Sequence, residues 1–213
     1  YYILVLCFLA LVIDGYIQYF TGSNLAGFQI SGFRVSSFFG DELIMGSYLS
    51  RLFPLLFALF LKKKKKKFEI YFIGFLFILA DILIFMSGER TAFFFLNLST
   101  IFIIILIKEY QKFRLVTFIV AIIIVTIFSF NSSKHAKRMF INPAKDMGVI
   151  QSTHPTNSNM IIIKKPVIFS LDHDSHIRTA FNMFKDRSIL GHGPKMFRLK
   201  CSNSKYETGI KPC

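Results

Sequence analysis

Three arginines occupy positions at which a guanidinium group could bind a ligand: Arg34, Arg90 and Arg178. A guanidinium is a planar fork of N–H donors that stays protonated and matches the oxygens of a phosphate group. If the three side chains converge, they form a pocket for a diphosphate. Two of them also have a simpler interpretation, since Arg90 could reach lipid headgroups from a helix end and Arg178 could pair with a surface carboxylate.

Two other stretches carry residue types found in ligand sites. Residues 172–176 combine two aspartates with two histidines three residues apart, which could hold a cation. They also lie at an expected helix start, where aspartate and serine act as caps. Residues 191–195 lack the Gly-Lys-Ser/Thr ending of a phosphate-binding loop and are typical of a tight turn. We therefore expect no metal and no other cofactor.

The composition is that of a membrane protein. Of the 213 residues, 53% are hydrophobic, 27 are phenylalanine, and the mean hydropathy is +0.51. A membrane-spanning helix needs about 20 mostly apolar residues. Five stretches come close to that length: 1–20, 43–61, 68–86, 91–107 and 115–130. We therefore predict an all-α, polytopic membrane bundle of about five spans in 1–130, followed by a long, partly helical loop region in 131–213.

Six consecutive lysines at 62–67 set the expected orientation of the bundle. Positively charged loops stay in the cytoplasm, so this loop and the basic stretch 108–114 are expected inside. Residues 21–42, 88–90 and 131–213 are then outside, and all three candidate arginines share that side. One observation conflicts with this topology, because four basic residues follow the fifth span on the outside: Lys134, Lys137, Arg138 and Lys145.

Local patterns predict how some elements begin and pack. Asp41 and Glu42 are expected in the first turn of the second span, where they favour a helix start. Arg51, within that span, could be a partner for Asp81 or could lie near a helix end. A helix capped by Asp174 or Ser175 is predicted from apolar residues spaced i, i+3, i+4, i+7, namely Ile177, Ala180, Phe181 and Phe184. Its apolar face, with Met183, is expected on the membrane surface or against the helix bundle.

The net charge of +14 invites a nucleic-acid interpretation, which we reject. The basic residues concentrate in the lysine run and in the polar region 131–213, beside a membrane, where anionic lipid or a phosphorylated glycolipid is the expected partner. Two of the three cysteines, Cys201 and Cys213, lie in this region with eleven residues between them. They could form a disulfide if the region is outside the cytoplasm, or remain two thiols.

Three segments, in this order on a polytopic frame, resemble the O-antigen ligase/polymerase family. No single segment is specific for the family, but the order and spacing of the three segments together are specific for it. The resemblance covers roughly residues 30 to 213. The segments are Phe-Arg-Val-Ser-Ser-Phe-Phe-Gly-Asp-Glu at 33–42, Ser-Gly-Glu-Arg-Thr-Ala at 87–92, and the residues from Arg178 through Met183-Phe184-Lys185-Asp186 and Ile189–Pro194 to Phe197.

The resemblance implies a multi-pass glycosyltransferase of the bacterial inner membrane whose long loop is periplasmic. Such proteins act in lipopolysaccharide assembly. They move a glycan from an undecaprenyl diphosphate carrier to lipid A core or to a growing polysaccharide, so the partners are that donor, an acceptor glycolipid or glycan, and membrane lipid. They need no metal and no nucleotide sugar. The resemblance assigns diphosphate binding to Arg90 and Arg178, and to Arg34.

The resemblance also implies that the 213 residues are a fragment. In this family the catalytic histidine lies in a motif that would come beyond Cys213, and His192 is not that residue. Two alternatives to the transferase are a transporter or flippase fragment, with Asp14 or Arg51 as its midplane ionisable residue, and a non-catalytic protein that binds anionic lipid through the lysines at 62–67.

Overall fold

The computed structural model describes residues 1–62, 66–147, 153–155, 160–162 and 171–206. It divides into two compact units, Tyr1–Met139 and Phe140–Cys213. The first unit extends beyond residue 130 because the segment after the fifth helix packs back on the bundle, where Met139 joins the apolar core. The middle of the lysine run at 62–67 lies outside the described residues.

Five long helices form the first unit: α1 (Tyr2–Thr21), α2 (Met45–Leu61), α3 (Lys67–Met86), α4 (Arg90–Leu106) and α5 (Gln111–Asn131). Three stretches are long and apolar enough to cross a membrane: Tyr2–Thr21, Lys67–Met86 and Lys108–Phe130. Helices α2 and α4 are apolar but have only 17 residues each. The unit is therefore a helical membrane bundle with three candidate spanning helices.

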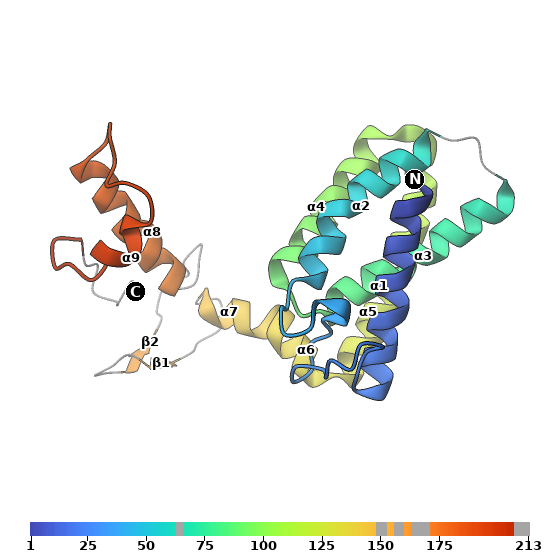
Figure 1. The fold of residues 1–213 in the computed structure, drawn as a ribbon, viewed down its shortest axis with the longest axis horizontal. Helices are drawn as coiled ribbons and strands as arrows, with labels where there is room; N and C mark the ends of the chain where they lie inside the picture. Colours follow the sequence, from blue (N-terminus) through green and yellow to red (C-terminus); the bar gives the residue numbers. More distant parts are fainter. Residues whose placement is uncertain (63–65, 148–152, 156–159, 163–170, 207–213) are drawn as a thin grey trace. The chain divides into compact units, whose positions relative to one another are not determined.

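Successive helices of the bundle run in opposite directions (Figure 1). The loop after α1, the turn between α3 and α4, and the end of α5 consequently meet at one end of the unit. Hydrogen bonds join these three segments, from Arg34 to the carbonyl of Ser87 and between His135 and the carbonyl of Met86. We call this end of the bundle the turn end.

Aromatic rings fill the bundle core. Phe77 of α3 lies among three phenylalanines of α2, with ring centroids 4.7 Å from Phe53, 5.7 Å from Phe57 and 6.2 Å from Phe60. Large apolar side chains on the outside of the bundle remain exposed, among them Tyr71, Phe75, Ile119 and Ile123. A soluble monomer rarely exposes so much contiguous apolar surface, which is the surface that lipid tails would cover.

Two buried polar residues of α1 determine the path of the following loop. Asp14 accepts hydrogen bonds from the Ser37 hydroxyl at 2.6 Å and from a loop backbone N–H at 2.9 Å. One turn later, Oε1 of Gln18 accepts from the backbone N–H groups of Ser36 and Ser37 at 2.9 and 2.7 Å. Buried polar groups need such partners, so the loop has to run over α1 at these points. This holds Arg34 at the turn end.

Arg114 lies inside the bundle, so the prediction that it belongs to a basic loop over 108–114 is wrong. It belongs to α5, is fully buried, and donates to the Asp81 carboxylate of α3 at 2.8 and 3.2 Å. Its guanidinium also donates to Thr100 of α4 and lies 4.4 Å from the centre of the Phe53 ring. Asp81 is therefore paired with Arg114 and not with Arg51, which is exposed on α2.

Short elements follow α5. They are α6 (Ser133–Ala136), the π-helical turn η3 (Lys137–Ile141), α7 (Asn142–Asp146), and the antiparallel strands β1 (Thr153–Pro155) and β2 (Met160–Ile162). Two 3₁₀ turns, η1 (Ser37–Phe39) and η2 (Lys108–Tyr110), lie within the first unit. The first part of the predicted loop region 131–213 thus contains, among its described residues, short helices and a strand pair.

In the second unit, α8 (Leu171–Asp186) is the amphipathic helix predicted from the apolar spacing. It begins before Asp174 and Ser175, so the expected caps are wrong and both residues lie inside the helix. A turn with positive φ at Gly191 and Gly193 leads to α9 (Met196–Lys200). Asp186 connects the end of α8 to the segment after α9, because the Lys205 ammonium and the Tyr206 hydroxyl both donate hydrogen bonds to its carboxylate. These donors lower the pKa of Asp186 to about 2.

Candidate functional site

The turn between α3 and α4 is attached to the start of α2 by Glu89. The backbone N–H groups of Gly46 and Ser47 donate to the Glu89 carboxylate at 2.7 and 3.1 Å, and the Ser47 hydroxyl donates to it at 2.5 Å. N–H groups in the first turn of a helix have no intrahelical acceptor. A carboxylate from a different loop therefore supplies the cap of α2 and fixes the geometry of the turn.

The prediction that Asp41 and Glu42 open this helix is wrong. Helix α2 begins at Met45, and its first turn contains no acidic residue. The close approach of the turn requires glycine at position 46, because a Cβ there would lie 2.3 Å from the Ser87 hydroxyl oxygen. A larger residue at this position would separate the turn from α2.

Two arginines flank Gly88 at the centre of the turn. Nε of Arg34 donates to the carbonyl of Ser87 at 2.8 Å, and Nε of Arg138 donates to the carbonyl of Gly88 at 2.8 Å. Gly88 has a φ of +68°, and a Cβ on it would lie 3.2 Å from Arg34 Cγ and 3.4 Å from Arg138 Cδ. Glycine is needed here both for the backbone conformation and for the space that the arginines occupy.

Arg90, the first residue of α4, joins the same group. Its Nε donates to the carbonyl of Arg138 at 3.0 Å. Arg34, Arg90 and Arg138 thus meet around one turn, and we call them the turn-end arginines. These three guanidinium groups lie near the single carboxylate of Glu89, so the cluster around the turn carries an excess of positive charge.

Each of the turn-end arginines donates from Nε to a backbone carbonyl. Arg34 also donates from its terminal Nη2 to the carbonyl of Leu43 at 3.3 Å, whereas the described hydrogen bond of the Arg138 side chain is from Nε. Among the described residues, none accepts a hydrogen bond from the terminal Nη groups of Arg138. Burial lowers the pKa of Arg34, the nearby charge of Arg138 lowers it further and that of Glu89 raises it. An arginine nevertheless stays charged at neutral pH. The arrangement suits binding of a phosphate-bearing anion.

His135 fixes the segment that carries Arg138. It is buried among the rings of Phe33, Phe85 and Phe128, with centroids 4.8, 6.2 and 5.1 Å away. Its Nε2 lies 3.2 Å from the carbonyl of Met86, which can only accept, so the ring proton is on Nε2. Burial lowers the pKa of His135, so the ring is neutral at physiological pH. His135 is therefore a positioning residue for the turn end.

Arg138 is a site residue that the sequence does not reveal. It is one of the basic residues that conflict with the predicted topology, and no local pattern distinguishes it from Lys134 or Lys137. Its role depends on the packing of α6 and η3 against the turn, which is a tertiary contact. Arg34 and Arg90, in contrast, are predicted site residues, and the structure brings these two together at the turn.

Arg178 lies in the second unit, on α8. It forms an i, i+4 ion pair with Asp174, with Nε 2.6 Å from the carboxylate, and its side chain is largely exposed. Its expected convergence with Arg34 and Arg90 stays a prediction. Cys201 is buried, and Cys213 lies outside the described residues, so their pairing also stays a prediction. Within the part of the chain that the structure describes, no group of three or more potential metal ligands is found.

Comparison with known protein families, with curated proteins and with solved structures finds no match. Membership of the O-antigen ligase/polymerase family therefore stays a prediction from the residues. What the fold and site define is a helical membrane protein that gathers three arginines at one end of its bundle.

Proposed function

We propose that this chain is part of a bacterial inner-membrane glycosyltransferase of the O-antigen ligase/polymerase kind. Its donor is a glycan on undecaprenyl diphosphate, and its acceptor is lipid A core or a growing polysaccharide. The observation that carries the proposal is the meeting of Arg34 and Arg90 at one turn. Both belong to the segments that resemble this family, and both are residues to which the resemblance assigns the diphosphate.

In the proposed topology all five helices α1–α5 cross the bilayer. Helices of 17 residues are about 25 Å long, at the lower end of what a bilayer requires. The lysines at 62–67 are cytoplasmic, so the turn end and the second unit are periplasmic. This is the side on which lipid-linked glycans are transferred in the resembled family. Arg178 is proposed as a third diphosphate ligand.

The turn-end arginines would act by electrostatics. Breaking the bond between the sugar and the diphosphate leaves negative charge on the departing group. Guanidinium groups that the fold already holds in place stabilise this charge without reorganising. Their Nε anchors to the carbonyls of the turn and η3 supply that rigidity. We assign no catalytic base within the described residues.

No observation favours the transporter alternative. It depends on Asp14 or Arg51 as an ionisable residue near the membrane midplane. Asp14 is buried, and its carboxylate binds the loop after α1. Arg51 is exposed and lines a groove of about 360 Å³ between α2 and α4 with mostly apolar residues. Asp14 therefore has a structural explanation that requires no transported substrate.

Binding of the lipid diphosphate tests the proposal. The purified chain in neutral-lipid nanodiscs is titrated with undecaprenyl diphosphate and, separately, with undecaprenyl monophosphate. Charge-assisted hydrogen bonds contribute about 1.5–3 kcal/mol each, so we expect Arg34→Gln with Arg90→Gln to weaken diphosphate binding more than tenfold. Arg198→Gln, on α9, is the matched control and should bind normally. Equal affinities for the two lipids, or an undiminished affinity in the double variant, would contradict the proposal.

A further inference from the structure

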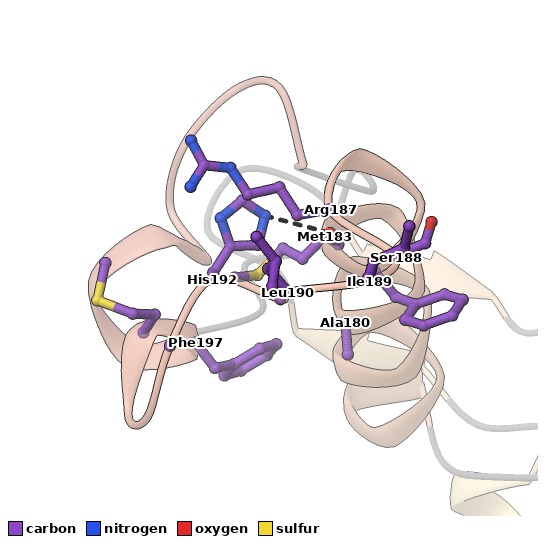
Figure 2. Close-up of a pocket in the computed structure, with 12 residues that line it drawn as sticks. Ala180, Met183, Arg187, Ser188, Ile189, Leu190, His192 and Phe197 are labelled. Atoms are coloured by element: carbon purple, nitrogen blue, oxygen red, sulfur yellow. Dashed lines mark hydrogen bonds between the residues drawn. The ribbon is translucent and has the colours of Figure 1, made fainter.

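The apolar face of α8 and the turn after it are exposed. Ile177, Phe181 and Phe184 all have about half of their surface accessible, and in the following turn Ile189 is 96% and Leu190 91% exposed. Figure 2 shows Ile189 and Leu190 beside Arg187, along a groove of about 490 Å³ between α8 and α9. We call Phe181, Phe184, Ile189 and Leu190 the apolar edge.

The face of α8 that is buried is mostly polar. Ser175, Thr179 and Met183, spaced by four residues, are 3%, 0% and 6% exposed. A surface helix of a soluble protein buries its apolar stripe and exposes its polar one. Helix α8 instead exposes the apolar side chains Phe181 and Phe184 and buries polar ones. The apolar edge therefore requires an apolar partner.

Basic residues border the apolar edge. The ammonium of Lys185 lies 4.7 Å from the centre of the Phe181 ring, and Arg187, two residues later and just beyond the end of α8, lines the groove. Residues 171–206 contain seven Lys or Arg against three Asp. Two of those aspartates, Asp174 and Asp186, are already in ion pairs with Arg178 and Lys205. The surface around the edge is therefore positive, which complements a negatively charged partner.

We propose that the apolar edge docks on an anionic phospholipid bilayer. Phe181, Phe184, Ile189 and Leu190 enter the boundary between headgroups and acyl chains, and Lys185 and Arg187 bind lipid phosphates. The helices of the first unit place a bilayer within tethered reach of the second unit, so its effective concentration is high. A lipid surface supplies both the apolar depth and the negative charge that this edge requires. The inference does not depend on the proposed glycosyltransferase activity.

A single tryptophan reports this docking, because the chain contains no Trp. The full chain carrying Phe184→Trp is reconstituted in vesicles of phosphatidylcholine with phosphatidylglycerol, some of the lipids being brominated. We expect a blue-shifted emission that bromines near the headgroups quench more strongly than bromines deep in the acyl chains. Ser204→Trp, on an exposed polar turn, is the control and should be quenched much less.

The charge contribution is tested in the same vesicles. Each basic residue near an anionic surface contributes about 1 kcal/mol, which corresponds to roughly a fivefold change in the docked-to-undocked ratio. Lys185→Gln and Arg187→Gln should each lower that ratio by about this factor, and removing phosphatidylglycerol should lower it further. Ile189→Ser with Leu190→Ser should reduce the quenching even in anionic vesicles.

Other occupants of the edge give different results. An unquenched but blue-shifted emission in anionic vesicles would show that the edge packs on protein, either the helix bundle or a second copy of the chain. An unshifted, unquenched emission would show that it stays in water. Quenching that is the same with and without phosphatidylglycerol and in the charge variants would show that the docking is not anion-dependent. Each of these three outcomes would overturn the proposal.

Discussion

Replacing Arg114 by methionine is expected to destabilise the helical unit by about 3–5 kcal/mol, because it leaves a buried carboxylate without its partner. Arg114 and Asp81 are 0% and 3% exposed and are joined by two hydrogen bonds. Arg114 also connects α5 to Thr100 of α4. A single substitution therefore weakens contacts among three helices. The free energy of unfolding, measured by denaturation in mixed micelles, should fall accordingly.

A second variant distinguishes the stability lost by leaving a charge unpaired from the stability lost by changed packing. Asp81→Leu combined with Arg114→Met removes both charges, and replacing a buried pair by apolar residues is often close to neutral. The double variant should therefore recover most of the lost stability. Arg51→Met is the control, since Arg51 is exposed on α2. If Arg114→Met were as stable as the parent chain, the pair would not be holding α3, α4 and α5 together.

Replacing Arg90 by alanine is expected to abolish glycan transfer in cells whose surface glycan depends on this protein. Removing one fixed donor from a developing negative charge typically lowers a rate by about 10²–10³-fold. Arg90→Lys should retain part of the activity, because it keeps the charge but loses the planar fork. Surface glycan is measured by gel electrophoresis, and membrane abundance by immunoblotting.

The abundance measurement separates a binding defect from a folding defect. Arg90→Ala removes an exposed side chain whose described hydrogen bond is to the backbone of Arg138, so the amount of protein in the membrane should not change. Arg198→Ala, which removes an arginine outside the site, should leave the glycan intact. Normal surface glycan in Arg90→Ala would contradict the assignment of the diphosphate to the turn end.

The helices could be predicted from the sequence because lipid-facing and core-facing residues are both apolar. Continuous runs therefore mark α1 to α5 to within a few residues at most ends. Arg34 and Arg90 could be found because they are the basic residues of the loops 21–42 and 88–90, which are expected outside the cytoplasm, where positive charge does not serve as a topology signal. The start of α2 could not be placed, since its cap is Glu89 from a loop far along the chain. Local rules on acidic residues favoured Asp41 and Glu42 instead.

Arg114 and Arg138 escaped prediction for a related reason. In sequence, Arg114 follows Lys108 and Lys112 and has the spacing of a cytoplasmic loop. Its burial depends on Asp81 and Thr100, which belong to two other helices. Arg138 becomes a site residue only because His135 binds α6 to the end of α3. The face of α8 that is buried could not be predicted either, since periodicity identifies the apolar stripe but not the partner that covers it.

The proposed function requires the turn end to lie on the periplasmic side of the membrane, and a reporter fusion measures this directly. Alkaline phosphatase, which is active only outside the cytoplasm, is fused after Phe130 at the end of the fifth apolar stretch, and in a second chain after Ile107. We expect an active enzyme after Phe130 and an inactive one after Ile107. Activity after Ile107 with none after Phe130 would place Arg34, Arg90 and Arg138 in the cytoplasm, away from any periplasmic lipid diphosphate, and would contradict the proposed function.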